Sequence, residues 1–137
     1  MHTPLIFVPM LYVTDVTAAI AFYAQAFRAT LRWKIDHEGR AHVAELEVGG
    51  SLLRLHEETP IRRELSPDNL QGTTVVVHLL VQDADAYMVQ AVAAGAIETS
   101  PMQDHDYGYR QGNLQDPFGH RWVLERIDDM YKVPLVP

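Results

Sequence analysis

The amino-acid sequence predicts one α+β domain, residues 1–137, built from two copies of a β-α-β-β-β module. A length of 137 residues is typical of a single domain with one hydrophobic core. An apolar run, an Asp and an alanine-rich stretch occur twice, at an offset of about 68 residues, which indicates an internal repeat. We expect modules at about 4–58 and 73–127, a linker at about 59–72 and a C-terminal tail at 128–137.

Each module begins with a strand followed by a helix. Residues 11–15 (LYVTD) match residues 79–83 (LLVQD), and Asp15 and Asp83 are placed as helix N-caps. The first helix is expected to run to about Phe27, with apolar residues at helical spacing. Gly95 is placed to end the second helix.

Three strands are expected after each helix. In the first module they are residues 31–36, 42–48 and 52–56, and in the second 97–102, 111–115 and 121–125. The last hairpin turns at Gly49-Gly50 in one module and at residues 116–119 in the other. We expect His120, which follows the second turn, to hydrogen-bond within that hairpin.

The composition excludes several classes of protein. A net charge of −7 and a pI near 5.4 argue against nucleic-acid partners, which need a basic surface. The chain has no cysteine, so disulfides and thiolate sites are excluded. Neither a secretory signal nor an apolar stretch long enough for a membrane span is found in the sequence. We therefore expect a cytoplasmic protein with no membrane partner.

Two segments carry a family resemblance. Residues 13–23 (VTDVTAAIAFY) and 107–122 (YGYRQGNLQDPFGHRW) resemble the vicinal oxygen chelate superfamily, the group of glyoxalases, bleomycin-resistance proteins and extradiol dioxygenases. The likeness is greatest to its PhnB-like or bleomycin-resistance-like branch. It implies eight strands in a curved mixed sheet of two half-barrels, with the helices on the outer face. It also implies a homodimer that encloses a small-molecule cavity.

The resemblance further implies four metal-ligand positions, one on the first and one on the last strand of each module. In this sequence they are Val8, Arg54, Val76 and Val123. Valine has no lone pair to donate, and the arginine guanidinium stays protonated in proteins. We therefore predict no metal at these positions and no cofactor. A displaced metal site that uses His56 and His78 remains an alternative.

Strand alternation sorts the candidate ligand-binding residues. If Val8 faces the cavity, Ile6 does so too, whereas Phe7 faces the helices. Arg54 could pair with a ligand anion, or with Glu125 or Glu45. With two tyrosines from the segment at 103–110, the predicted ligand-binding set is Val8, Met10, Tyr12, Arg54, His56, Val76, His78, Tyr107, Tyr109 and Val123.

No catalytic residue is identified. His56, His78 and His105 are the candidates, the last with Asp104 or Asp106 to orient it. The sequence favours a metal-independent protein that binds and sequesters a small cationic or aromatic compound such as an antibiotic. One alternative is a glyoxalase-type lyase or isomerase that acts without the usual metal. Another is a noncatalytic partner that acts through its dimer surface.

Overall fold

A computed structural model of the chain describes residues 5–106 and 108–126. Module 1 comprises β1 (Met10–Val13), α1 (Val16–Phe27), β2 (Thr30–His37), β3 (Arg40–Val48) and β4 (Ser51–Glu57). The connection to the second module contains η1 (Pro60–Arg62) and α2 (Pro67–Leu70). Module 2 comprises β5 (Val76–Val81), α3 (Ala84–Ala94), β6 (Ile97–Asp104), β7 (Arg110–Gln115) and β8 (Arg121–Arg126).

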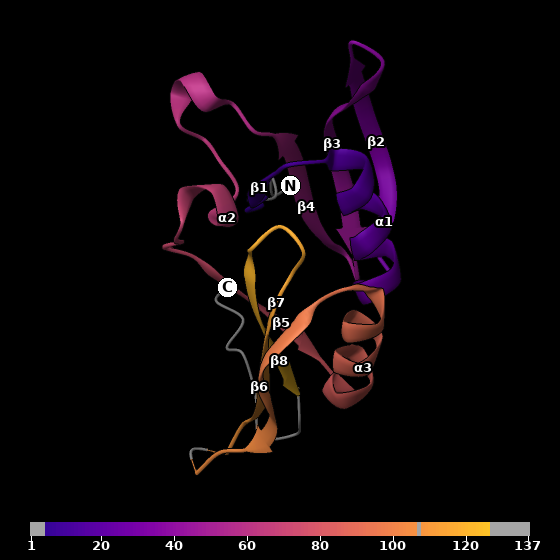
Figure 1. Cartoon of the computed structure of the whole chain (residues 1–137). Helices are drawn as coiled ribbons and strands as arrows, with labels where there is room; N and C mark the ends of the chain where they lie inside the picture. Colours follow the sequence, from indigo (N-terminus) through magenta and orange to yellow (C-terminus); the bar gives the residue numbers. More distant parts are fainter. Residues whose placement is uncertain (1–4, 107, 127–137) are drawn as a thin grey trace.

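The strands form two four-stranded mixed sheets with the same topology. Their orders are β1-β4-β3-β2 and β5-β8-β7-β6, and in each sheet the first and last strands of the module pair in parallel. Helices α1 and α3 lie one after the other along the same side of the two sheets (Figure 1). The predicted α+β class with two β-α-β-β-β modules is confirmed.

Both long helices begin as predicted. The Asp15 carboxylate accepts a hydrogen bond from the Ala18 amide at 3.0 Å, and Asp83 accepts one from Ala86 at 3.1 Å. Helix α1 ends at Arg28, which adopts a left-handed conformation, and α3 ends at Gly95. Among the described residues, neither α1 nor any other helix has the length and apolar character needed to cross a membrane.

Alternation along the strands gives each sheet two faces. The core face packs against α1 and α3, and the opposite face, which we call the open face, does not. The strand residues Leu53, Leu55, Trp122 and Leu124 lie on the core face, and all four are buried.

The first strand is shorter than expected. It begins at Met10, so Val8 lies before the strand and does not alternate with it. The side chain of Phe7 is 90% exposed, so its predicted packing against the helices is wrong. Pro9 has no amide hydrogen to donate to a neighbouring strand, although its carbonyl accepts a hydrogen bond from the backbone amide of Arg54 at 2.9 Å.

The two modules are joined through buried aromatic and polar contacts. Trp122 of β8 packs on Phe27 of α1, with ring centroids 4.8 Å apart. The Tyr23 hydroxyl of α1 donates to the buried Asp116 carboxylate, which also accepts from Trp122 Nε1 at 3.0 Å. His120 Nε2 donates to the Tyr12 carbonyl of β1 at 2.8 Å. Within its own hairpin, the His120 amide donates to Asp116 Oδ1 and its carbonyl accepts from the Asp116 amide, both at 2.9 Å. The predicted bond within the hairpin is therefore confirmed, and the bond to Tyr12 adds a contact with the other module.

Candidate functional site

The open face of module 1 is organised in rows of side chains across the sheet. The strand register places Met10 beside Arg54, Arg54 beside Glu45, and Glu45 beside Trp33. The next row contains Tyr12, His56, Val43 and Ile35. Residues in such rows touch because neighbouring strands lie about 5 Å apart. The sheet therefore brings Arg54, His56, Met10 and Tyr12 from the predicted ligand-binding set onto one surface.

Glu45 lies at the centre of the first row. Its carboxylate is buried, and Oε1 accepts a hydrogen bond from Arg54 Nε at 2.9 Å. The other oxygen, Oε2, accepts from Trp33 Nε1 at 3.1 Å and lies 3.7 Å from Arg32 NH1. Of the two intramolecular partners predicted for Arg54, Glu45 is therefore the one that the fold supplies.

The second row contains an oriented imidazole. His56 Nδ1 lies 2.7 Å from the Glu57 carbonyl oxygen. Because a carbonyl can only accept, Nδ1 carries the hydrogen, and in the neutral ring Nε2 keeps the lone pair. The ring of Tyr12 lies 5.2 Å from that of His56.

The connection between the modules holds Tyr12 in place. The Tyr12 hydroxyl donates to Glu64 at 2.8 Å. Burial and this bond to a carboxylate raise the pKa of Tyr12 above its ordinary value. Hydrogen bonds from Tyr12 and Thr59 lower the pKa of Glu64. Tyr12 therefore stays protonated and serves as a fixed hydrogen-bond donor.

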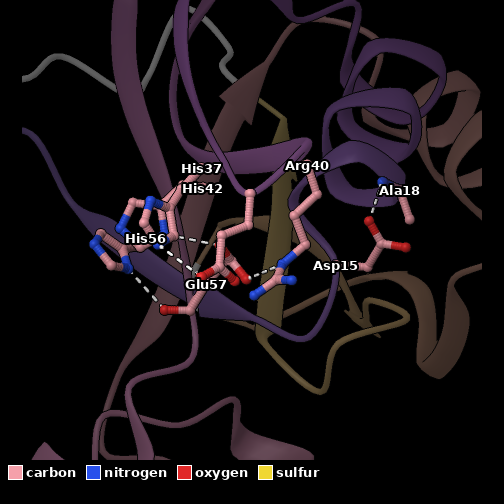
Figure 2. Close-up of polar contacts among 8 residues, drawn as sticks. Asp15, Ala18, His37, Arg40, His42, His56 and Glu57 are labelled. Atoms are coloured by element: carbon pink, nitrogen blue, oxygen red, sulfur yellow. Dashed lines mark hydrogen bonds and ion pairs between the residues drawn. The ribbon is translucent and has the colours of Figure 1, made fainter.

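A histidine cluster lies at the end of this face, where β2, β3 and β4 meet. Figure 2 shows His37, His42 and His56 side by side, with Arg40 on the other side of Glu57. The Glu57 carboxylate accepts from Arg40 Nε and from His42 Nδ1, each at 2.7 Å. These two bonds, that of Arg40 foremost, lower the pKa of Glu57.

Sequence reasoning missed the role of His42. It stands at an irregularity of the β2–β3 pairing, where the register shifts between Ile35 and Asp36. The centroid of its ring lies 4.6 Å from that of His56. Strand alternation alone cannot place such a residue, because the extra residue of a bulge changes the face on which later side chains lie.

The open face of module 2 carries different chemistry. His78 pairs in register with Val123, and Val123 with Asn113. His78 Nδ1 lies 3.7 Å from the buried Glu125 carboxylate, to which Gln111 also donates. Asn113 takes the position that Glu45 occupies in module 1, and Ser100 takes that of Trp33. This face therefore presents a carboxylate, an imidazole and amides, and none of the contacts of the described residues joins an arginine to the Glu125 carboxylate.

The residues at the predicted metal positions do not fit a divalent cation. Val8, Val76 and Val123 offer no ligand atom, and Arg54 brings a positive charge. Within residues 5–106 and 108–126, no three histidine, aspartate or glutamate side chains are grouped so that they could hold a metal ion. His56 and His78 lie in different modules, and none of the contacts of the described residues joins them within one chain.

Five of the predicted ligand-binding residues line separate cavities of one chain. A cavity of about 660 Å³ between β1 and the connection is lined by Met10, Tyr12 and His120. One of about 260 Å³ between the modules includes His78. A third, of about 390 Å³, lies on module 2 and includes Val76 and Val123. The single chain therefore does not bring these residues into one pocket.

The remaining candidates lie at the tip of the β6–β7 hairpin. The His105 amide donates to the Tyr109 carbonyl at 2.8 Å, and Arg110 NH1 lies 3.4 Å from Asp104. Asp104 therefore bonds to an arginine. Tyr107 lies outside the described residues.

Comparisons with known proteins agree with this architecture. The sequence model of the Glyoxalase/Bleomycin resistance protein/Dioxygenase superfamily matches residues 6–124. The uncharacterized protein Mb0911c of Mycobacterium bovis is 36% identical over 120 residues, which cover 85% of this chain and 79% of that protein. The uncharacterized protein Rv0887c of Mycobacterium tuberculosis has the same identity, and the match covers 85% of this chain and 71% of that protein.

Two solved structures show the same fold. TioX from Micromonospora sp. ML1 is 25% identical with a TM-score of 0.69, covering 90% of this chain and 98% of TioX. A bleomycin-binding protein complexed with bleomycin is 19% identical with a TM-score of 0.66, covering 89% and 98%. At that identity the second likeness concerns the fold alone. With the family match over most of its length, this chain belongs to the glyoxalase/bleomycin resistance protein/dioxygenase superfamily.

Proposed function

We propose that the protein binds a small, partly aromatic molecule on its open faces, without a divalent metal, and that it does so as a homodimer of single-domain chains. The apolar surface around Arg54 and Glu45 carries this proposal. Met10 and Trp33 are each 37% exposed, and Ile35 is 56% exposed. On module 2, Val76 is 48% exposed. Apolar side chains gathered around a few oriented polar groups are typical of ligand sites.

A second copy of the chain would complete such a site. The exposed apolar residues lie on sheet faces that α1 and α3 do not cover, and clustered exposed apolar residues commonly mark an interface. Five of the candidate ligand residues are spread over separate cavities in one chain, and Arg54 and His56 lie on the open face of module 1. Pairing the open face of one copy with that of another would enclose them.

The comparisons supply a first compound to test. One protein of the same fold is described as binding bleomycin, so sequestration of an antibiotic is a reasonable starting hypothesis. Sequestration needs burial and shape but no reactive group. Cytoplasmic sequestration of such a compound is compatible with the net charge of −7, which also serves solubility.

Native mass spectrometry tests the assembly, and a thermal-shift assay tests binding. We expect a dimer in the wild type, a monomer in I35E, and a dimer in V89E, because Val89 is an exposed residue of α3 outside the open faces. Bleomycin should raise the melting temperature of the wild type and of V89E but not of I35E. A monomeric wild type would contradict the homodimer, and an unmoved melting temperature would remove bleomycin as a ligand.

Elemental analysis of the purified protein tests the metal independence. We expect no stoichiometric divalent ion, because the four positions carry three valines and an arginine. One equivalent of zinc, nickel or manganese that survives dialysis would contradict this part of the proposal.

A second candidate function is a glyoxalase-type lyase or isomerase. The orientation of His56 favours it, since Nδ1 bonds to the Glu57 carbonyl and Nε2 is left as a base. The hemithioacetal of methylglyoxal and glutathione is a suitable probe. If this candidate is correct, metal-free wild type consumes the probe and H56Q loses the activity, whereas H78Q retains it. Absence of turnover by the wild type would contradict it for this substrate.

A further inference from the structure

We propose that Arg54 and Trp33 form a site for the carboxylate of a planar aromatic acid. This inference rests on the proposed binding function and names the class of ligand that the module 1 face takes. The guanidinium of Arg54 is fixed through Nε, which donates to Glu45 at 2.9 Å. Among the described residues, no acceptor lies within hydrogen-bonding distance of its two terminal nitrogens. They are therefore available to a ligand.

The terminal edge of a guanidinium matches a carboxylate in shape. Two parallel N–H donors bind the two carboxylate oxygens at once, and this paired bond is stronger and more directional than that of a lysine ammonium. In Arg54 the orientation is set before binding, because the Nε bond to a buried carboxylate restricts the rotation of the side chain. Less conformational entropy is then lost when the ligand binds.

Glu45 orients Arg54 but does not fully neutralise its positive charge. The Glu45 carboxylate is shared with Trp33 Nε1 at 3.1 Å and with Arg32 NH1 at 3.7 Å. Two arginines thus face one buried carboxylate. Glu47, the other acid of β3 on this face, is exposed, and none of the described contacts joins it to Arg54. Around this site the positive charges of the two arginines face the negative charges of Glu45 and Glu47. A singly charged anion is therefore favoured over a phosphate dianion, which the two glutamates would repel more strongly.

Trp33 provides the surface for the planar part of the ligand. Its ring centroid lies 5.7 Å from Arg54 Cζ, within the range of a cation–π contact, and the residue is 37% exposed. Met10, at the other end of the row, offers a flexible apolar wall. An aromatic acid can therefore place its carboxylate on Arg54 and its ring between Trp33 and Met10. A cationic ligand would instead meet the like charge of Arg54.

Titration of the full-length, ¹⁵N-labelled protein with three matched probes tests the proposal. The probes are 2-naphthoate, 2-naphthamide and 2-naphthamidine, which share a ring system and differ in charge. The reporter is the Trp33 indole N–H resonance, assigned by its loss in W33F. We expect 2-naphthoate to bind about tenfold or more tightly than the amide, as a charge-assisted bond predicts, and the amidine to bind most weakly.

Variants locate the effect at Arg54. R54Q should lose the preference for naphthoate over naphthamide, and R54K should keep only part of it, since lysine lacks the paired donors. R63Q is the matched control, because Arg63 is an exposed arginine of the connection that follows η1 and lies outside the open faces. It should bind naphthoate as the wild type does. A thermal melt confirms that each variant is folded. If R54Q is not folded, the partial loss of the naphthoate preference in R54K is the test.

The outcomes separate this inference from the function on which it rests. Equal binding of all three probes, unchanged in R54Q, would overturn the carboxylate site and leave an apolar binding surface in place. Binding of the amidine alone would overturn it in favour of a cation site. Failure of all three probes, with bleomycin still stabilising the protein, would also overturn the carboxylate site but not the binding function.

Discussion

The hairpin between β3 and β4 turns in open space, whereas the matching hairpin between β7 and β8 turns against the rest of the molecule. An added Cβ at Gly50 would meet no atom within 4 Å. At Gly119 it would lie 2.7 Å from the Asp68 backbone nitrogen of α2. The residue three positions before each glycine also differs: Glu47 is exposed and Asp116 is buried. The β7–β8 turn thus forms part of the joint between the modules, whereas the β3–β4 turn does not.

The open faces of the two modules also differ in the side chains that they present. Module 1 presents Arg54, Trp33 and an oriented His56, whereas module 2 presents amides beside Glu125. The shared topology gives both modules the same rows of positions. The residues that occupy the rows give module 1 an arginine, an indole and an imidazole on its open face, and they give module 2 amides beside a carboxylate.

Removing the Asp116 carboxylate should have the largest effect on stability. It accepts bonds from the Phe118 and His120 amides, from Trp122 Nε1 and from the Tyr23 hydroxyl. D116A leaves several of these donors unsatisfied in the interior, and we expect a loss of about 3–5 kcal/mol. E47A, a change three residues before Gly50, should lie within about 0.5 kcal/mol of wild type, because Glu47 is exposed. Urea denaturation measures both, and equal losses would show that the two turns are equivalent.

A pair of glycine substitutions isolates the packing at the joint. Gly50 and Gly119 both have positive φ, 87° and 93°, so alanine is strained at each by about 1 kcal/mol. Only G119A also forces the backbone of Asp68 to move, and we expect a total of about 3 kcal/mol. Thermal unfolding of G50A and G119A gives the comparison. Similar midpoints would mean that α2 does not pack tightly against this turn.

Tyr23 tests the joint from the side of α1. Y23F removes the hydroxyl donor to Asp116, which should cost about 1.5–3 kcal/mol at neutral pH. Burial foremost, and then the Asp116 carboxylate, raises the pKa of Tyr23 well above 10.0. The folded state therefore keeps this proton above pH 10, where the unfolded chain loses it. Stability is unaffected below that pH and falls as the pH rises above it.

Urea denaturation at neutral pH and above pH 10 checks this prediction. The wild type should lose stability over this interval, and Y23F should lose less. The difference in the free energy of unfolding between the two proteins should therefore become smaller. Some dependence should remain in Y23F, because the pKa of Tyr12 is also raised. A deficit that is constant across the interval would contradict a buried, proton-retaining Tyr23.

Local patterns in the sequence were enough to predict much of the fold. Asp15 and Asp83 cap their helices, and the repeat offset placed corresponding strands, because capping and alternation depend on neighbours in the chain. The start of β1 was missed because a single proline ended an otherwise apolar strand pattern.

The candidate site was predicted less completely. Alternation placed Arg54 on the open face but left its partner open between Glu45 and Glu125, since only the cross-strand register shows which acid lies beside it. The bond from His120 to Tyr12 joins residues 108 positions apart and has no local pattern. The assignment of the ligand-binding set remains a prediction, because its members meet only if a second chain closes the open faces.

Removing either N-cap should have the smallest effect on the free energy of unfolding. Here the two modules should respond equally. Asp15 and Asp83 each accept one bond from the amide three residues later, at 3.0 and 3.1 Å. D15A and D83A should each cost about 1 kcal/mol, because the same cap is lost from the first turn of a helix. Urea denaturation should place the two variants within about 0.5 kcal/mol of each other. If D15A instead cost far more than D83A, the difference between the modules would extend beyond the turn and the open face, since α1 also carries Tyr23 and Phe27 of the joint. If both variants lose the same free energy of unfolding, the modules differ only around Asp116 in the joint and around Arg54 on the open face.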